Sequence, residues 1–179
     1  MKILTVDESA AWLDARSLRL LPAEQWGAHH QIEIPAEFER LAFAMPQRAT
    51  VQVALAQLLA EWFVPHSALL LADVSALFET HEVGAFLFLR YYYGDSAWRE
   101  PVPGGATPGH VFADGDPEDP RNLREFLNVV MAYTRHGCFV QDDGSVLVRM
   151  AGELIELAAR EPARMARPRE IVQQLKLKP

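Results

Sequence analysis

The feature that most constrains the fold of this chain is a tight turn between two apolar runs near residue 144. Cys138-Phe139-Val140 and Val146-Leu147-Val148 flank Asp142-Asp143-Gly144. Asp-Gly is a favoured turn dipeptide of β-hairpins, and the β-branched and aromatic residues on either side favour strands. The sequence therefore predicts a β-hairpin over residues 138–148.

Three segments are predicted to be amphipathic helices. The clearest covers residues 50–63, where Thr50 can act as the N-cap and apolar residues recur at helical spacing. Its core-facing residues are Val51, Leu55, Leu58, Leu59 and Trp62. A second helix should run from Asp7 to about residue 20, and a third from Asp119-Pro120 to about residue 133, ended by Gly137.

Short strands are predicted at 30–34, 39–45 and 67–74, where apolar residues alternate or run together between prolines. The segment 153–160 fits either a short final helix or a strand that leads into one. With the hairpin, these elements indicate a mixed α/β (α+β) fold. We expect one domain with about five short strands in a sheet that is flanked by helices.

The two ends of the chain differ in charge. The 179 residues include 24 acidic and 17 basic side chains, for a net charge of −7 with neutral histidines. Residues 160–179 hold six basic and two acidic residues, a net charge of +4, so residues 1–159 sum to −11. We expect residues 1–160 to form the globular domain and residues 161–179 a basic C-terminal tail with room for a short helix.

Composition also narrows the classes of function. An acidic body disfavours binding to nucleic-acid phosphates and can attract a basic partner. No apolar run approaches the ~20 residues of a membrane span, and residues 1–7 lack the pattern of a signal peptide. We therefore expect a cytoplasmic protein without membrane association. Cys138 is the only cysteine, which excludes an internal disulfide and a cysteine-rich zinc site.

Two side-chain groups could carry chemistry. His136 and Cys138 would share one face of an extended strand, so the histidine could activate Cys138 as a nucleophile. A histidine at a helix end beside a small buried cysteine explains the two residues more simply. His110 with Asp114 or Asp116 could bind a metal or act as a base, although Asp-x-Asp is also common in turns. No phosphate-binding glycine loop, zinc-protease motif or nucleophile elbow is present in the sequence. We expect no cofactor, no metal and no enzymatic activity.

The stretch 83–120 holds the candidate partner surface. Residues 83–93 fit a helix that ends at Gly94, with a strand as the alternative. Residues 94–120 are rich in proline and glycine and predict a long loop, which is usually functional or mobile. The aromatic, arginine and acidic residues of these segments are of the types found at binding surfaces. The candidates are Arg90, Tyr92, Tyr93, Trp98, Asp114, Asp116, Glu118 and Asp119.

Three motifs follow one another between residues 49 and 157. They are Leu87-x-x-Arg90-x-x-Tyr93-Gly94-Asp95, then Pro108-Gly109-His110-x-Phe112, then Asn122-Leu123-x-x-Phe126-Leu127 with Gly137 before the hairpin. In this order they resemble a family of small bacterial proteins that are similar to polymorphic-toxin immunity proteins in size and acidity. The resemblance implies that Gly94-Asp95 and Pro108-Gly109-His110 are framework turns, and it supplies no catalytic residue.

The leading hypothesis is a protein-binding inhibitor of the immunity or antitoxin type, whose acidic body meets a basic toxin or nuclease. One alternative is a small hydrolase or metal-dependent enzyme that uses His110 with Asp114 or Asp116. Another is a structural or oligomerisation subunit whose basic tail docks on the acidic body of a second copy. These hypotheses differ in which residues must be accessible, so the packing of the tail and of His110 bears on them.

Overall fold

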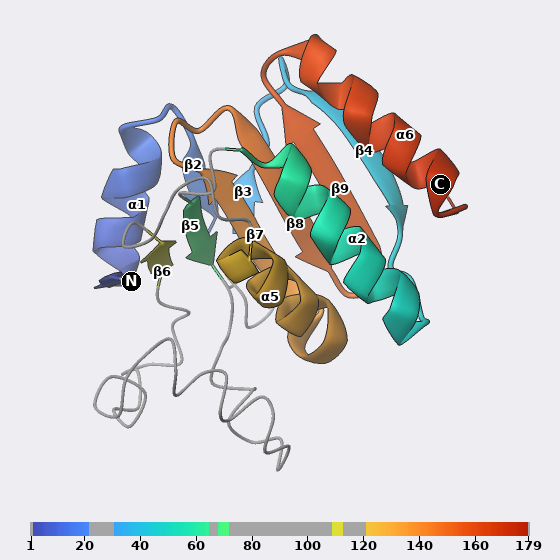
Figure 1. The fold of residues 1–179 in the computed structure, drawn as a ribbon. Coiled ribbons are helices and arrows are strands. Elements are labelled where there is room, and N and C mark those ends of the chain that lie inside the picture. Colours follow the sequence, from blue (N-terminus) through green and yellow to red (C-terminus); the bar gives the residue numbers. More distant parts are fainter. Residues whose placement is uncertain (1, 22–30, 65–67, 72–108, 113–120, 179) are drawn as a thin grey trace.

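The computed structural model describes residues 2–21, 31–64, 68–71, 109–112 and 121–178 (Figure 1). The elements in chain order are β1 Lys2–Leu4, α1 Val6–Asp14, β2 Arg19–Leu21, β3 Gln31–Glu33, β4 Glu39–Ala44, α2 Ala49–Trp62, β5 Ala68–Leu71, β6 Gly109–Phe112, α5 Arg121–Val129, the π-helical turn η3 Val130–Thr134, β7 His136–Gln141, β8 Val146–Ala151, β9 Leu154–Ala159, the 3-10 turn η4 Pro162–Met165 and α6 Ala166–Gln174. Helices and strands alternate irregularly, which confirms the expected single domain of mixed α+β class.

The main sheet contains seven strands in the order β1-β6-β5-β7-β8-β9-β4, and every pairing in it is antiparallel. The predicted hairpin lies at its centre as β7 and β8, with Val140 opposite Leu147. Gly144 adopts a φ of +73° in the turn, where an added Cβ would lie 2.8 Å from the Cβ of Arg16. Both the left-handed backbone and the close approach of Arg16, in the turn after α1, therefore require glycine there.

One face of the main sheet, here called the helix face, is covered by α2, α5 with η3, and α6 (Figure 1). Its core combines inward residues of the helices, such as Leu55, Leu59 and Phe126, with alternate strand residues such as Phe139 and Leu157. All five are at most 1% exposed. The stripe predicted for 50–63 faces this core, since Leu55, Leu59 and Trp62 are buried and Val51 and Leu58 are half-buried.

The opposite face, here called the far face, is covered by α1 and by the small antiparallel sheet of β2 and β3. Leu13, Leu18 and Ile32 from these elements pack against Val140 and Leu147 of the central hairpin. Because the sheet is covered on both sides, β5 is apolar on both faces, with Ala68 in the helix-face core and Leu69 in the far-face core.

Most predicted elements lie within a residue or two of their expected bounds, but the first helix is shorter than predicted. It starts one residue after Thr5, whose side chain and backbone form a capping box with Glu8, and it ends at Asp14. The chain then reverses at Ser17, which has a φ of +59°, and continues as β2. The Leu18 side chain is buried as expected, but from the turn after the helix.

In the second half of the chain two local predictions are corrected, and the alternative left open at 153–160 is decided in favour of a strand that leads into a helix. Residues 109–112 form strand β6 inside the predicted long loop, because pairing with β1 and β5 outweighs the nearby proline and glycine. The third helix is ended by Arg135, at a φ of +53°, whereas Gly137 lies within β7. Residues 154–159 are a strand, β9, because the segment pairs with β8 on one edge and β4 on the other and is buried on both faces.

The basic C-terminal residues pack against their own sheet. Met165 and Ile171 are fully buried in the helix-face core, the Trp62 indole donates to the Arg164 carbonyl at 2.9 Å, and the Ala44 amide donates to the Lys178 carbonyl at 2.8 Å. The short helix for which the sequence left room is α6, and it runs beside β4 and α2 (Figure 1).

Candidate functional site

The predicted partner surface cannot be located in the structure. Arg90, Tyr92, Tyr93, Trp98, Asp114, Asp116, Glu118 and Asp119 all lie outside the described residues. The same holds for the predicted element at 83–93 and for the resemblance motif that begins at Leu87. The candidate groups in the described residues are those that the sheet and its covering helices bring together.

His110 belongs to β6, an interior strand. It pairs with Ile3 of β1 on one side and with Leu70 of β5 on the other. The two aspartates with which it could form a metal or acid–base site, Asp114 and Asp116, lie outside the described ranges. Within those ranges, no group of three histidine, cysteine or carboxylate side chains has the geometry to hold a metal ion.

Cys138 lies in the far-face core and is 1% exposed. Its thiol donates a hydrogen bond to the Gln31 Oε1 atom at 3.3 Å. Burial raises the pKa of Cys138 to about 12, and a hydrogen bond from the Ile32 backbone offsets only part of that effect. Since the thiolate is the nucleophilic form, a thiol held neutral and covered is a poor nucleophile. The interpretation of Cys138 as a small buried residue is confirmed.

His136 lies directly after a helix end, at the position that the sequence predicted. It is the first residue of β7, one position after the residue that ends η3. It shares the far face with Cys138, but the hydrogen bond from the thiol goes to Gln31.

A line of charged residues crosses the far face beside Cys138. Arg149 of β8 is directly opposite Cys138 on one side and Glu156 of β9 on the other. Arg149 and Glu156 form an ion pair, and Arg40 NH1 of β4 lies 3.8 Å from the second oxygen of Glu156. The Glu156 side chain is 11% exposed, Arg149 20% and Arg40 42%, so the cluster opens toward the β4 side. It carries two guanidinium groups for one carboxylate.

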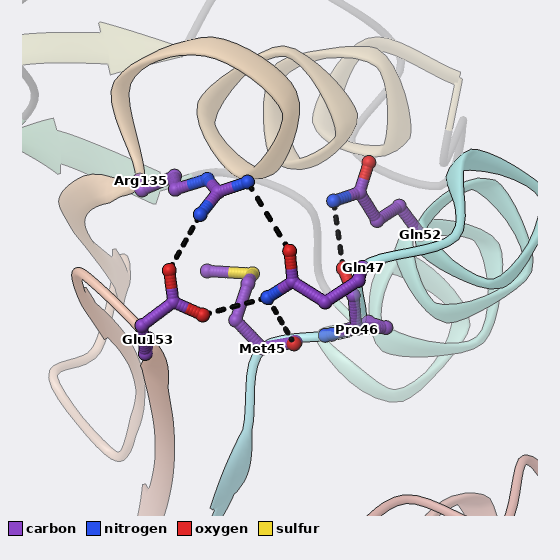
Figure 2. Close-up of polar contacts among 6 residues, drawn as sticks. All are labelled: Met45, Pro46, Gln47, Gln52, Arg135 and Glu153. Atoms are coloured by element: carbon purple, nitrogen blue, oxygen red, sulfur yellow. Dashed lines mark hydrogen bonds and ion pairs between the residues drawn. The ribbon is translucent and has the colours of Figure 1, made fainter.

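A second polar group, the Arg135 cluster, consists of Gln47, Arg135 and Glu153 (Figure 2). Arg135 NH1 donates to Glu153 Oε1 at 2.6 Å, and Gln47 Nε2 donates to the other oxygen of Glu153 at 2.6 Å. Arg135 NH2 also donates to Gln47 Oε1 at 3.4 Å, which closes a ring of three hydrogen bonds. The cluster joins the end of η3 to the turn before β9 and to the segment before α2.

The backbone around Arg135 is unusual for a residue with a side chain. The Arg135 amide closes a π-helical turn by donating to the Val130 carbonyl at 2.7 Å, and its own carbonyl accepts from the Gly152 amide at 2.8 Å. A positive φ at a non-glycine residue costs of order 1 kcal/mol, and π turns are frequent at functional sites. Contacts at both ends of the residue hold this conformation in place.

The chemical capacity of these groups is binding and positioning. The Arg135 cluster has an Arg side chain that is 37% exposed and a Glu side chain that is 70% exposed, both within reach of a partner. It contains no nucleophile and no pair of carboxylates for acid–base work. The far-face cluster offers excess positive charge beside the open edge of β4.

Sequence reasoning missed both clusters because their members are distant in the chain. Gln47 and Arg135 are 88 positions apart, and Gln47 and Glu153 are 106 apart. The sequence held one local indication of the ion pair between Arg149 and Glu156. If two strands are joined by a turn at Gly152, these residues lie opposite each other.

Comparison with known proteins leaves the fold and these clusters as the basis for assigning a function. No protein-family model, curated protein or solved structure matches the chain. Among the described residues, no helix is long and apolar enough to cross a membrane.

Proposed function

We propose that this protein is a protein-binding module, an immunity-type or antitoxin-type inhibitor that recognises a basic toxin or nuclease in the bacterial cytoplasm. The proposal rests on the distribution of charge. Residues 72–120 contain nine acidic and two basic side chains, a net charge of −7 that equals the charge of the whole chain. The remaining residues carry 15 charges of each sign. The acidity is thus confined to the stretch 72–120, which β6 divides into 72–108 and 113–120, and is not a property of the domain as a whole.

The strands on either side of residues 72–108 support a role for this segment in binding. Leu71 of β5 is directly paired with Gly109 of β6, so the chain leaves and rejoins the main sheet at neighbouring positions. Concentrated charge of one sign accelerates association with an oppositely charged protein and favours partners of complementary potential.

The packing of the C-terminal residues disfavours the alternative in which a free basic tail docks on a second copy. Arg164 NH2 donates to the Trp62 carbonyl at 3.0 Å, and Arg169 and Arg167 form ion pairs with Glu39 and Glu170 of the same chain. These arginines already have partners within their own domain. A basic protein that meets the acidic segment is the better match for the charge distribution.

The test is to co-express the protein with the product of the adjacent gene and to isolate a stoichiometric complex by gel filtration. In that complex, neutralising the acidic candidates with Asp114→Asn, Asp116→Asn, Glu118→Gln and Asp119→Asn should slow association at least about tenfold at low salt. A wild-type complex whose association rate does not fall as salt rises would contradict the proposal, as would the absence of any complex.

A matched control neutralises four acidic residues of the described domain that are exposed: Asp7→Asn, Asp14→Asn, Glu37→Gln and Glu161→Gln. It changes the net charge by the same amount at positions outside 72–120. We expect it to slow association far less than the substitutions at 114–119. Equal effects of the two sets would show that only overall charge matters.

A further inference from the structure

We propose that the outer edge of β4 is a docking site for an extended acidic peptide segment, which adds to the main sheet as a further strand. The inference is independent of the proposed function, because it concerns a different region and a partner of opposite charge. It rests on the unpaired backbone groups of β4 and on the charges that surround them. Among the strands of the described residues, β4 is the last on its side of the sheet (Figure 1).

The backbone hydrogen bonds near the end of β4 define which residues face outward. The Met45 amide donates inward to the Glu153 carbonyl at 2.8 Å, whereas the Ala44 amide donates outward to the Lys178 carbonyl at 2.8 Å. Since successive residues of a strand alternate in direction, Arg40 and Ala42 also point their amide and carbonyl groups outward. Among the described residues, these groups have no backbone partner.

This edge lacks two of the features that normally prevent strand addition, a very short strand and a proline. At the opposite side of the sheet β1 has three residues, but β4 has six and contains no proline. Leu41, Ala42 and Phe43 are consecutive uncharged residues in its middle. Arg40 and Ala42 are both exposed. Among the described residues, Lys178 occupies the edge at Ala44 alone, where the outward Ala44 amide donates to the Lys178 carbonyl, so this edge already pairs with backbone from another segment.

Positive charge lies on both sides of this edge. On the far face, Arg40 uses its NH2 group on the Ile34 and Pro35 carbonyls at 2.6 and 3.2 Å, while the Glu156 carboxylate lies 3.8 Å from its NH1 group and is already paired with Arg149. Donors of the Arg40 guanidinium therefore remain for an incoming carboxylate. An acidic side chain opposite Arg40 would form a favourable cross-strand pair.

On the helix face, α6 runs beside the same edge. Arg169 of α6 pairs with Glu39 at the start of β4, and the Lys178 carbonyl binds Ala44 at its end. Lys176 and Lys178 are exposed. Residues 160–179 carry a net charge of +4, so an acidic strand is the complementary occupant. A second copy of this chain is a less suitable occupant, because pairing two β4 edges would bring two basic α6 helices side by side.

The first experiment uses the unmodified protein. A short synthetic peptide that alternates glutamate and valine is titrated, and amide hydrogen exchange is followed residue by residue with NMR. Before addition, the outward amides of Arg40 and Ala42 should exchange quickly and the inward amides of Leu41 and Phe43 slowly. The peptide should slow exchange at Arg40 and Ala42 at least about tenfold. Binding without added protection at these two amides would overturn the proposal.

The second experiment measures affinity by fluorescence anisotropy with variants. Ala42→Pro removes an outward amide and leaves the inward pairing with β9 intact. It should therefore lower the affinity for the acidic peptide about tenfold or more. The matched Ala42→Thr variant keeps the amide and should bind within a few-fold of the native protein. Circular dichroism confirms that both variants retain the fold. If Ala42→Pro binds as well as Ala42→Thr, the edge is not the site.

The charge of the occupant is tested separately. A peptide that alternates lysine and valine should bind at least about tenfold more weakly than the acidic one, and Arg40→Gln should narrow that difference. Equal binding of the two peptides would overturn the acidic assignment. So would light scattering that finds a dimer which Ala42→Pro converts to a monomer, since the occupant would then be a second copy.

Discussion

The two faces of the main sheet differ in what they contribute. In the part of the chain that the structure describes, the helix face holds about twice as many buried apolar residues as the far face and contains the large side chains of Phe43, Phe63, Phe126 and Phe139. The far face mixes an apolar core with the buried Cys138 thiol and the ion pair of Arg149 and Glu156. The difference indicates that the helix face supplies most of the stability, while the far face keeps polar groups near the open edge of β4.

Neighbouring residues of β7 allow the sharpest test of this comparison. Phe139 and Val140 are both fully buried, but Phe139 faces the helices and Val140 faces α1 and β3. Phe139→Ala should lower the free energy of unfolding by about 3–5 kcal/mol because it leaves a large cavity, and Val140→Ala should lower it by less. Urea denaturation measures both. A larger loss for Val140→Ala would reverse the ranking of the faces.

The ion pair on the far face should matter more than an ion pair at the surface. Glu156→Gln removes the carboxylate that pairs with the mostly buried Arg149 guanidinium, so we expect a loss of about 1–3 kcal/mol in the free energy of unfolding. The control is Glu170→Gln, whose side chain is 65% exposed in its pair with Arg167 and should cost below about 0.5 kcal/mol. Thermal unfolding of the two variants that gives equal shifts would refute the distinction.

The Cys138 thiol gives the far face a dependence on pH. Its pKa is raised from 9.0 to about 12 in the folded protein, so the unfolded chain loses this proton at lower pH than the folded one. The contribution of the Cys138 thiol to the free energy of unfolding is therefore fully present below pH 9. It falls as pH rises from 9 toward 12, by about 1 kcal/mol over the first unit. Denaturation of the native protein and of Cys138→Ala at pH 8 and pH 10 checks this. The difference in free energy of unfolding between the two should shrink at pH 10.

The smallest expected effect concerns Arg135. Arg135→Ala removes the hydrogen bonds of the Arg135 cluster and keeps the positive φ, whereas Arg135→Gly removes the same bonds and relieves the backbone. The glycine variant should be more stable than the alanine variant by about 1 kcal/mol. Chemical denaturation of the pair isolates the backbone cost. Equal stabilities would mean that the left-handed conformation carries no strain.

Prediction from sequence succeeded where the local pattern and the tertiary environment agreed. The helix at 49–62 has both a helical stripe and a core to face, and the hairpin at 136–151 has both a turn dipeptide and two apolar strands. It failed where the partner in space decided the conformation. The strand at 109–112 is the clearest case, since its four residues sit in a segment rich in proline and glycine and are ordered by β1 and β5.

The sequence by itself determined the class of the fold, the central hairpin, the buried character of Cys138 and the confinement of the net charge to residues 72–120, because each follows from local spacing or from composition. Only the tertiary structure decided that the basic C-terminal residues pack on their own sheet, that Arg135 closes a polar ring with Gln47 and Glu153, and that β4 ends the sheet with outward amides. Those features depend on which strands become neighbours. Strand pairing in an antiparallel sheet is set by the sum of many contacts between residues far apart in the chain, and no local pattern records that sum.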